Sequence, residues 1–430
     1  MQPFTIIIPT YNRSSFLEQT LRSLTYQTRQ DFHIILIDHG SQDNTKSIFE
    51  HYQQRLSIEY HYMMRSGHPN PGIPRDLGIR YATSPLIAFL DAGMIVPPFY
   101  VASHCTFHEA NPHCVGIGLQ HVASENLLLT PEQLVSLMTQ LEHPENSEAN
   151  IFPYLQHYDI RKDRIQKSSP FVWSFGWTAN LSLPLVAYQE VGGFDLGFEG
   201  WGFEDLDLSY RLWKRGYQMV CVSDGWGVEL PHPRASEDER EQTEYRNMLY
   251  AYRKQRSLAL EALIYAKWSV KRIEETFRYL TALGHRYTTP AIFPDGLRAQ
   301  WSRPSLLIGY TTQETGDFDY RAVANEDVET TSSVWSASGV LIPLPDHSLA
   351  TVVVSDIWKH LDWSGQDATA SDGISLLECL IAELRRTTQK VWFFDTPSVA
   401  QERDLPHAST TLLTHLCEKY HLSFQIITHE

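Results

Sequence analysis

Acidic side chains stand at three places in the sequence where their chemistry could be used. Asp38 and Asp91 each end an apolar, strand-like run, and Glu204 and Asp205 open a helical segment just after a glycine-flanked tryptophan. A carboxylate in such a place can accept a proton or ligate a hard divalent cation. His232, in a proline-rich loop, carries an imidazole that could ligate the same kind of cation. Taken singly, each residue also has a structural reading, as a turn residue, a helix cap or a loop histidine.

The elements that would position these residues alternate along the first part of the chain. Strands are predicted wherever short apolar or β-branched runs stand between turn signals, at 5–8, 33–38, 57–64 and 85–90. A helix is predicted from Pro74 to Ala82. Strand–helix alternation predicts a parallel sheet covered by helices on both faces. Ligands of such sheets bind beyond the carboxyl ends of the strands, where Asp38 and Asp91 lie.

Five short motifs follow one another across roughly 230 residues: TIIIPTYNR at 5–13, IDHGSQDNT at 37–45, PRDLGI at 74–79, FLDAG at 89–93 and VGGFD at 191–195. In this order they resemble the family 2 glycosyltransferases of the GT-A fold. The last of these, with GWGFEDLDL at 200–208, also resembles the C-terminal part of the GT7 galactosyltransferases and of chondroitin-polymerase-type enzymes.

The resemblance implies a transferase that takes a sugar from a nucleotide-sugar donor, with a UDP-sugar expected. Asp91 resembles the first Asp of the family's Asp-x-Asp metal motif, but Gly93 stands in place of the second acid. His232 lies where related enzymes carry a distal metal-binding histidine. The resemblance therefore implies Mn²⁺ or Mg²⁺ held by Asp91 and His232, a cation that would neutralise the diphosphate leaving group. The departure at Gly93 puts a clamp of two carboxylates in doubt.

The same resemblance assigns residues to the nucleoside. Asp38 stands where the family has the first of two acids that contact the nucleoside, and the second position is occupied by His39. Three residues are implied to line the base and one to lie near the nucleotide, each with a surface role as the alternative: Pro9, Tyr11, Arg13 and Arg75.

Glu204 and Asp205 are the pair to which the resemblance gives the chemistry. In inverting GT-A enzymes the Asp of such a pair removes the proton of the acceptor, so Asp205 is the expected catalytic base and Glu204 the expected ligand of sugar hydroxyls. Helix capping is the alternative for both. Four further residues are implied to contact the sugars, with packing as the alternative for the last two: Trp201, Gly202, Trp177 and Asn180.

The fold class that follows is α/β, a GT-A fold with a helical extension and a second, smaller Rossmann-like domain. The length of 430 residues predicts more than one domain. The expected parts are a catalytic domain at 1–235, a helical extension at 236–285 ended by Gly284, a proline-containing linker at 286–303 and an α/β domain at 304–430.

The last of these parts resembles the second half of a class I methyltransferase through the segments 341–361, 376–386 and 391–395. At 306–316, where a glycine-rich cofactor loop is expected, bulky residues replace the glycines that allow close approach of a ligand. We therefore expect a degenerate domain without cofactor, kept for acceptor binding, for homo-oligomer formation or for a partner.

Composition and charge limit the binding partners and the cellular compartment that we expect. The formal net charge is −16, and residues 301–430 alone hold 18 acidic against 8 basic residues, so nucleic acid is not an expected partner. The sequence contains no run of 18 apolar residues, so no transmembrane segment is predicted from it. The five cysteines lack the paired spacing of a zinc site, and the chain opens directly with a strand-like run. A cytoplasmic protein is expected.

The function expected from the sequence is inverting transfer of a sugar from a nucleotide sugar to an acceptor. A peptide, a small-molecule natural product and a glycan all remain open as acceptors. Two alternatives stand beside this function. One is a bifunctional glycosyl- and methyltransferase, and the other is a non-catalytic binding module with a GT-A-like fold, which Gly93 makes conceivable.

Overall fold

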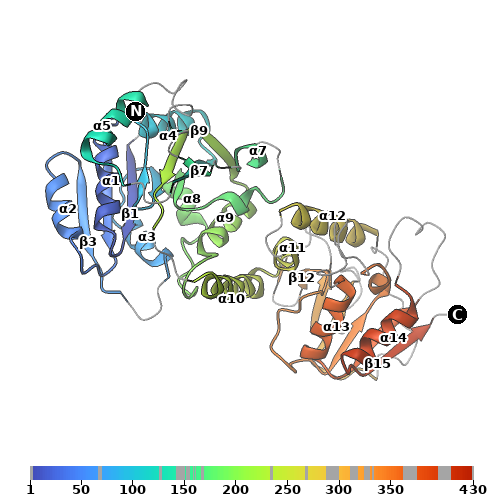
Figure 1. The fold of residues 1–430 in the computed structure, drawn as a ribbon. Coiled ribbons are helices and arrows are strands. Elements are labelled where there is room, and N and C mark those ends of the chain that lie inside the picture. The colour runs from blue at the N-terminus through green and yellow to red at the C-terminus, as the bar shows by residue number, and fades with distance from the viewer. Residues whose placement is uncertain are drawn as a thin grey trace. The chain divides into compact units, whose positions relative to one another are not determined.

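The chain forms two compact units, Met1–Asn247 and Met248–Glu430 (Figure 1). The structure is a computed structural model that describes residues 3–65, 70–124, 128–141, 151, 155–157, 159, 161–165, 169–232, 236–266, 270–286, 300–309, 318–323, 330–331, 334–361, 375–395 and 408–428.

The first unit is built on one mixed sheet with the strand order β3-β2-β1-β4-β8-β6-β9-β5. The first four strands in the chain are parallel: β1 (Phe4–Thr10), β2 (Phe32–Asp38), β3 (Ile58–Tyr62) and β4 (Leu86–Leu90). The antiparallel strand β8 (Asn180–Pro184) then joins β4 to β6 (Cys114–Ala123). The other strands are β5 (Met94–Ile95), β7 (Leu155–His157), which pairs with β6, and β9 (Gln218–Glu229), which lies parallel to β6.

Buried apolar side chains pack helices against this sheet. In α1 (Ser14–Leu24), Leu17, Leu21 and Leu24 recur at helical spacing, and they pack on the buried isoleucines of β1 and β2. The helix α2 (Thr45–Tyr52) lies beside α1 (Figure 1). Further helices in the described part of this unit are α3 (Gly72–Ile79), α4 (Tyr100–Ala110), α5 (Pro131–Gln140), α7 (Arg161–Ile165), η2 (Val172–Phe175), α8 (Leu185–Glu190) and α9 (Glu204–Lys214).

The second unit contains a sheet in which all neighbouring strands are parallel, in the order β12-β11-β10-β13-β14-β15. Numbered along the chain, this is the order 3-2-1-4-5-6 of the doubly wound nucleotide-binding folds, so the predicted Rossmann-like second domain is confirmed. Its strands are β10 (Ser305–Ile308), β11 (Tyr320–Val323), β12 (Val334–Ser336), β13 (Thr351–Val354), β14 (Val391–Asp395) and β15 (Phe424–Thr428). The unit also contains the short helix η4 (Asp356–His360). The helices α13 (Leu376–Thr387) and α14 (Thr410–Lys419) lie side by side on the sheet (Figure 1).

The predicted helical extension is divided rather than continuous. It consists of α10 (Glu237–Gln255), within which the boundary between the two units falls, α11 (Leu258–Ala266) and α12 (Val270–Arg286). The prediction that Gly284 ends the extension is wrong by two residues, since α12 continues to Arg286. Most of the predicted linker, 287–299, and of the expected cofactor loop, 310–317, lies outside the described residues. No helix in the described part of the chain is long and apolar enough to cross a membrane.

Candidate active site

Asp91 follows β4 directly, and the neighbouring strand fixes its place. The backbone N–H of Asp91 donates to the carbonyl of Ala179 at 3.1 Å, one residue before β8. Met94 closes the turn by donating to the Asp91 carbonyl at 3.1 Å. Gly93 lies inside this turn with a φ of 109°, a conformation that favours glycine. The residue that replaces the second acid of the motif therefore serves the turn, and the Asp91 side chain stays one-third exposed at 34%.

Arg75 forms an ion pair with Asp91. The buried guanidinium comes from α3, where Nη1 donates to the carbonyl of Pro71 at 2.8 Å and Nη2 donates to Oδ1 of Asp91. The structure thus brings together a residue predicted to lie near the nucleotide and the residue predicted to bind the metal. A guanidinium on this carboxylate compensates the same negative charge that a bound cation would compensate.

The Glu204–Asp205 pair opens α9 after a strained turn. Phe203 has a φ of 77°, in the left-handed region that a bulky side chain rarely adopts. Asn247 holds this turn by donating from Nδ2 to the Gly202 carbonyl at 2.7 Å. The Oδ1 atom of Asp205 accepts the Leu206 N–H at 2.8 Å.

Burial raises the pKa of both carboxyl groups, and the negative charge of Asp91 adds to it. Burial is the largest cause of the raised pKa of Glu204, and the charge of Asp205 adds to it while Arg75 opposes it. Burial also raises the pKa of Asp205, against the opposing charge of Arg75 and backbone hydrogen bonds from Leu206 and Thr178. Asp91 acts on both groups, so these four charged side chains form one electrostatic cluster. A half-buried carboxylate with a raised pKa is a stronger proton acceptor than an exposed one.

His232 lies beside the turn that carries Asp91. The Leu230 N–H donates to the Gly93 carbonyl at 3.0 Å, and the His232 ring meets Phe16, the residue that a Cβ on Gly93 would also contact. Nδ1 of His232 is 3.3 Å from the Leu230 carbonyl. Among the described residues no group of three or more His, Cys, Asp or Glu side chains could hold a metal. Asp91 and His232 therefore offer at most part of a coordination shell.

The nucleoside end of the site is built from the loops after β1 and β2. Asp38 is buried, and both of its carboxylate oxygens are engaged, Oδ1 by the Ser41 N–H at 2.8 Å and Oδ2 by the Tyr60 hydroxyl at 2.7 Å. The two loops are tied together, since the Asn12 N–H donates to Oγ of Ser41 at 2.9 Å. In this arrangement Asp38 shapes the loop rather than presenting an open carboxylate.

The residues predicted to line the base lie at the same edge. Tyr11 is half-exposed, and the guanidinium of Arg65 stacks on its ring at 3.7 Å from the centroid. Burial, aided by the charge of Arg65, lowers the pKa of His39 and keeps its ring neutral. Pro9 lies in β1, and Arg13 immediately precedes α1; both are partly buried. Nothing in the spacing of the sequence pointed to Arg65.

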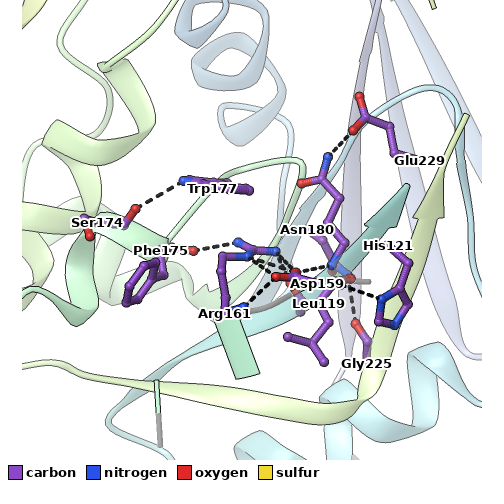
Figure 2. Close-up of polar contacts among 12 residues, drawn as sticks. Leu119, His121, Asp159, Arg161, Ser174, Phe175, Trp177, Asn180, Gly225 and Glu229 are labelled. Carbon is purple, nitrogen blue, oxygen red and sulfur yellow. Dashed lines mark hydrogen bonds and ion pairs between the residues drawn. The ribbon is translucent and has the colours of Figure 1, made fainter. Parts of the chain in front are cut away.

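The four residues predicted to contact the sugars separate into exposed and buried ones. Trp177 and Trp201 are exposed at 39% and 47%, so both indoles can receive a ligand. Gly202 is buried with a φ of 96°, against Glu244 of α10. Asn180 is buried, and its side chain donates to the carbonyls of Leu119 and Gly225 at 3.1 and 2.8 Å (Figure 2). It also accepts from the Tyr100 hydroxyl at 3.0 Å. Asn180 therefore joins β8 to its neighbours, which is the packing alternative.

Comparison with known proteins identifies this region. Residues 5–176 match the family described as glycosyl transferase family 2, and residues 165–233 match the one described as the N-terminal domain of galactosyltransferase. The first unit contains a glycosyl transferase family 2 domain. Its GT-A fold, predicted from the sequence, is confirmed by this match together with the mixed sheet.

The curated relatives are glycosyltransferases. Over 243 residues the chain is 35% identical to validoxylamine A glucosyltransferase of Streptomyces hygroscopicus subsp. jinggangensis, which covers 54% of this chain and 56% of that protein. Over 251 residues it is 30% identical to chondroitin synthase of Pasteurella multocida, covering 55% of this chain and 26% of that protein. The chain thus spans about half or less of the length of these two relatives.

Solved structures match this chain at lower similarity. S. aureus TarS 1–349 in complex with UDP-GlcNAc superposes with a TM-score of 0.42 at 18% identity, covering 66% of this chain and 80% of that one. The mannosyltransferase PcManGT of Pyrobaculum calidifontis, in complex with GDP-Man and Mn²⁺, gives a TM-score of 0.42 at 15% identity, covering 65% and 75%. TM-scores this low add nothing to the family match.

Proposed function

We propose that the chain is an inverting glycosyltransferase that moves a sugar from a UDP-sugar to a hydroxyl group of an acceptor. One observation carries the proposal. The Glu204–Asp205 pair and the Arg75–Asp91 ion pair form a single charged cluster inside the region that matches the two glycosyltransferase families. Relatives named for glucosyl transfer and for chondroitin synthesis support the reaction class.

Asp205 acts as the base in this proposal. Its carboxylate removes the proton of the acceptor hydroxyl while that oxygen attacks the anomeric carbon from the face opposite the donor's phosphate. The bond from the anomeric carbon to the phosphate oxygen breaks, and the nucleoside diphosphate leaves with the electron pair. Attack from the opposite face inverts the configuration at that carbon. The backbone N–H groups of Leu206 and Thr178 orient the carboxylate, and its partial exposure leaves room for the acceptor.

Glu204 and Arg75 serve the donor. The Glu204 carboxyl, deeper than Asp205, accepts or donates hydrogen bonds to hydroxyls of the transferred sugar. Arg75 carries a fixed positive charge that acts on the whole cluster, so it stabilises the charge that develops on the diphosphate. Both roles use groups that are held in place before the donor arrives.

A divalent cation fits this site only in company with the donor. Asp91 and His232 would hold it, and the cation would supply a Lewis acid that neutralises the diphosphate. One carboxylate and one imidazole are a hard oxygen and a nitrogen ligand suited to Mn²⁺, and the missing ligands would be phosphate oxygens and water. Metal and UDP should therefore bind with strong positive coupling.

For the second unit we propose a role without cofactor. Ligands of such sheets bind where the strand order reverses, here between β10 and β13. At this point Gly309, with a φ of 87°, lies so close to Ser355 and Ile357 that a Cβ would come within 2.3 Å of Oγ of Ser355. Ser355 and Ile357 therefore pack closely against the backbone that follows β10. Acceptor binding or self-association fits this unit better than methyl transfer, and calorimetry with S-adenosylmethionine tests the choice.

The primary test measures donor binding and turnover together. UDP should raise the melting temperature of the protein, and more so with Mn²⁺ present, because a ligand of the folded state stabilises it. Incubation with UDP-glucose or UDP-N-acetylglucosamine should release UDP. Stabilisation by UDP without release of UDP from any UDP-sugar would favour a binding module over an enzyme.

A further inference from the structure

A buried ion pair outside the predicted site holds one of the exposed tryptophans. The Arg161 and Asp159 side chains are only 3% and 4% exposed, and their closest approach is 2.6 Å. The guanidinium carbon of Arg161 lies 4.1 Å from the centroid of the Trp177 ring. Figure 2 shows the two side chains beside each other. A desolvated guanidinium against an indole face is a favourable cation–π contact.

The pair is pinned to two other segments of the same unit. Nη1 of Arg161 donates to the Phe175 carbonyl at 2.7 Å, and Nη2 donates to the Gly118 carbonyl of β6 at 3.2 Å. Asp159 accepts the Gln120 N–H at 2.7 Å in addition to the bonds from Arg161. The ion pair therefore fixes the orientation of the guanidinium plane, and the guanidinium in turn fixes the plane of the indole.

The backbone that carries this indole lies next to the proposed base. Trp177 is followed by Thr178, whose backbone N–H donates to the Asp205 carboxylate. The indole Nε1 donates to the Ser174 carbonyl at 3.1 Å, so the polar atom of the ring is used within the protein. Arg161 covers one face of the indole, and what remains exposed is an apolar aromatic surface. The base contacts the acceptor and not the leaving group, so this surface belongs to the acceptor side.

We propose that Arg161 and Asp159 are positioning residues that hold Trp177 as a stacking platform for a ring-shaped polyol acceptor beside Asp205. The inference rests on the proposed function for the identity of the base. A flat indole with its N–H turned inward matches the apolar face of a sugar or cyclitol ring. A linear polyol or an extended peptide offers no such face.

Full-length variants test the platform. Arg161→Lys keeps the charge that Asp159 needs but loses the planar group against the indole. Trp177→Ala removes the platform from a position that is already exposed, so folding is expected to survive even if Arg161→Lys does not fold. Arg211→Lys is the matched control, because Arg211 also pairs with a buried acid, Asp207, and also donates to a backbone carbonyl, that of Val191.

Binding is measured without requiring turnover. With UDP present, saturation-transfer NMR follows two ring probes, methyl β-D-glucopyranoside and myo-inositol, and one linear probe, D-glucitol. The wild type and Arg211→Lys should bind a ring probe saturably and bind glucitol much more weakly. Arg161→Lys should weaken ring binding about tenfold and Trp177→Ala should abolish it, while UDP affinity stays within about twofold of the wild type.

Each possible result either supports or overturns the proposed role of Trp177 and the Arg161–Asp159 pair. No ring binding by the wild type, equal binding of glucitol, or unchanged ring binding in Arg161→Lys and Trp177→Ala would overturn the inference. An equal loss of ring binding in Arg211→Lys, or a parallel loss of UDP affinity, would also overturn the inference, because the Arg161–Asp159 pair would then only stabilise the fold. Ring binding that depends on Trp177 in a protein that turns over no UDP-sugar would instead refute the proposed function and leave the platform standing.

Discussion

Replacing Asp205 by Asn is the sharpest test of the chemistry. Asn has nearly the shape of Asp but cannot take a proton from the acceptor at neutral pH. Loss of a positioned general base lowers turnover by about 10²–10⁴-fold, which corresponds to about 3–5 kcal/mol in the activation barrier. The affinity for the donor should hardly change, because the base contacts the acceptor.

The structure indicates that this variant folds. The Oδ1 atom of Asn can still accept the Leu206 N–H that Asp205 accepts at 2.8 Å. Losing a negative charge at the start of α9 costs about 0.3–1 kcal/mol. Removing a buried charge next to Glu204 acts in the opposite direction, since that neighbour and burial disfavour the charged form. The melting temperature should therefore stay close to that of the wild type.

Asp207→Asn is the matched control. Asp207 lies in the same first turn of α9 but is buried in an ion pair with Arg211, at 2.8 Å. Its loss leaves a charged partner uncompensated, so the melting temperature should fall while turnover per folded molecule stays near that of the wild type.

The assay is UDP release from UDP-glucose, with calorimetry for UDP affinity. Turnover of Asp205→Asn at the wild-type rate would remove Asp205 from the mechanism. An equal loss of turnover in Asp207→Asn would show that the assay reports the integrity of the helix rather than the base. A proton–proton coupling in the product NMR spectrum that shows retained anomeric configuration would refute direct displacement.

Three further predictions follow from the same structure. Burial raises the pKa of Glu204, so the folded state favours the protonated form, and the free energy of unfolding falls as pH rises above about 4.5. The melting temperature of Glu204→Gln should therefore exceed that of the wild type at pH 7.5, and the difference should vanish at pH 4. Burial lowers the pKa of His104 to about 3 and of His108 to about 4; both stay neutral when folded, so the unfolding free energy should fall as pH drops below about 6.5, less steeply in His108→Gln. Calorimetry should detect little Mn²⁺ binding alone and clear binding with UDP, and His232→Ala should weaken that coupling. Strong Mn²⁺ binding without UDP would contradict the proposal that the donor completes the metal coordination.

The first four strands were predictable from the sequence because each is a short apolar run with a clear end. The run at 85–90 became β4, Leu86–Leu90, with every residue buried. The run at 57–64 became the shorter β3, Ile58–Tyr62, which is the edge strand of its sheet and is only partly buried. Because an edge strand pairs with a neighbour on one side only, the pattern of apolar residues in the sequence defines its ends less sharply.

The partners of the site residues were not predictable, since they come from distant parts of the chain. The sequence singled out both Arg75 and Asp91 but not their ion pair, which depends on how α3 lies against the end of β4. Asp159 and Arg161 carry no motif at all, and their importance appears only when the guanidinium meets Trp177. The resemblance places Asn180 near the sugars, with packing as the alternative, and its three side-chain hydrogen bonds all lie within the fold.

The Arg75–Asp91 ion pair bears on how a weak metal site could still work. In the structure the guanidinium compensates Asp91, so that carboxylate does not stand as an uncompensated charge beside Glu204 and Asp205. A nucleoside diphosphate brings negative charge of its own, and the fixed charge of Arg75 can then serve the diphosphate as well. Under the proposed function, Asp91 would then become more available to a cation, and the same phosphates would supply the ligands that Asp91 and His232 lack. The proposal therefore does not need a second acid at Gly93 for metal dependence, because the donor itself would complete the site.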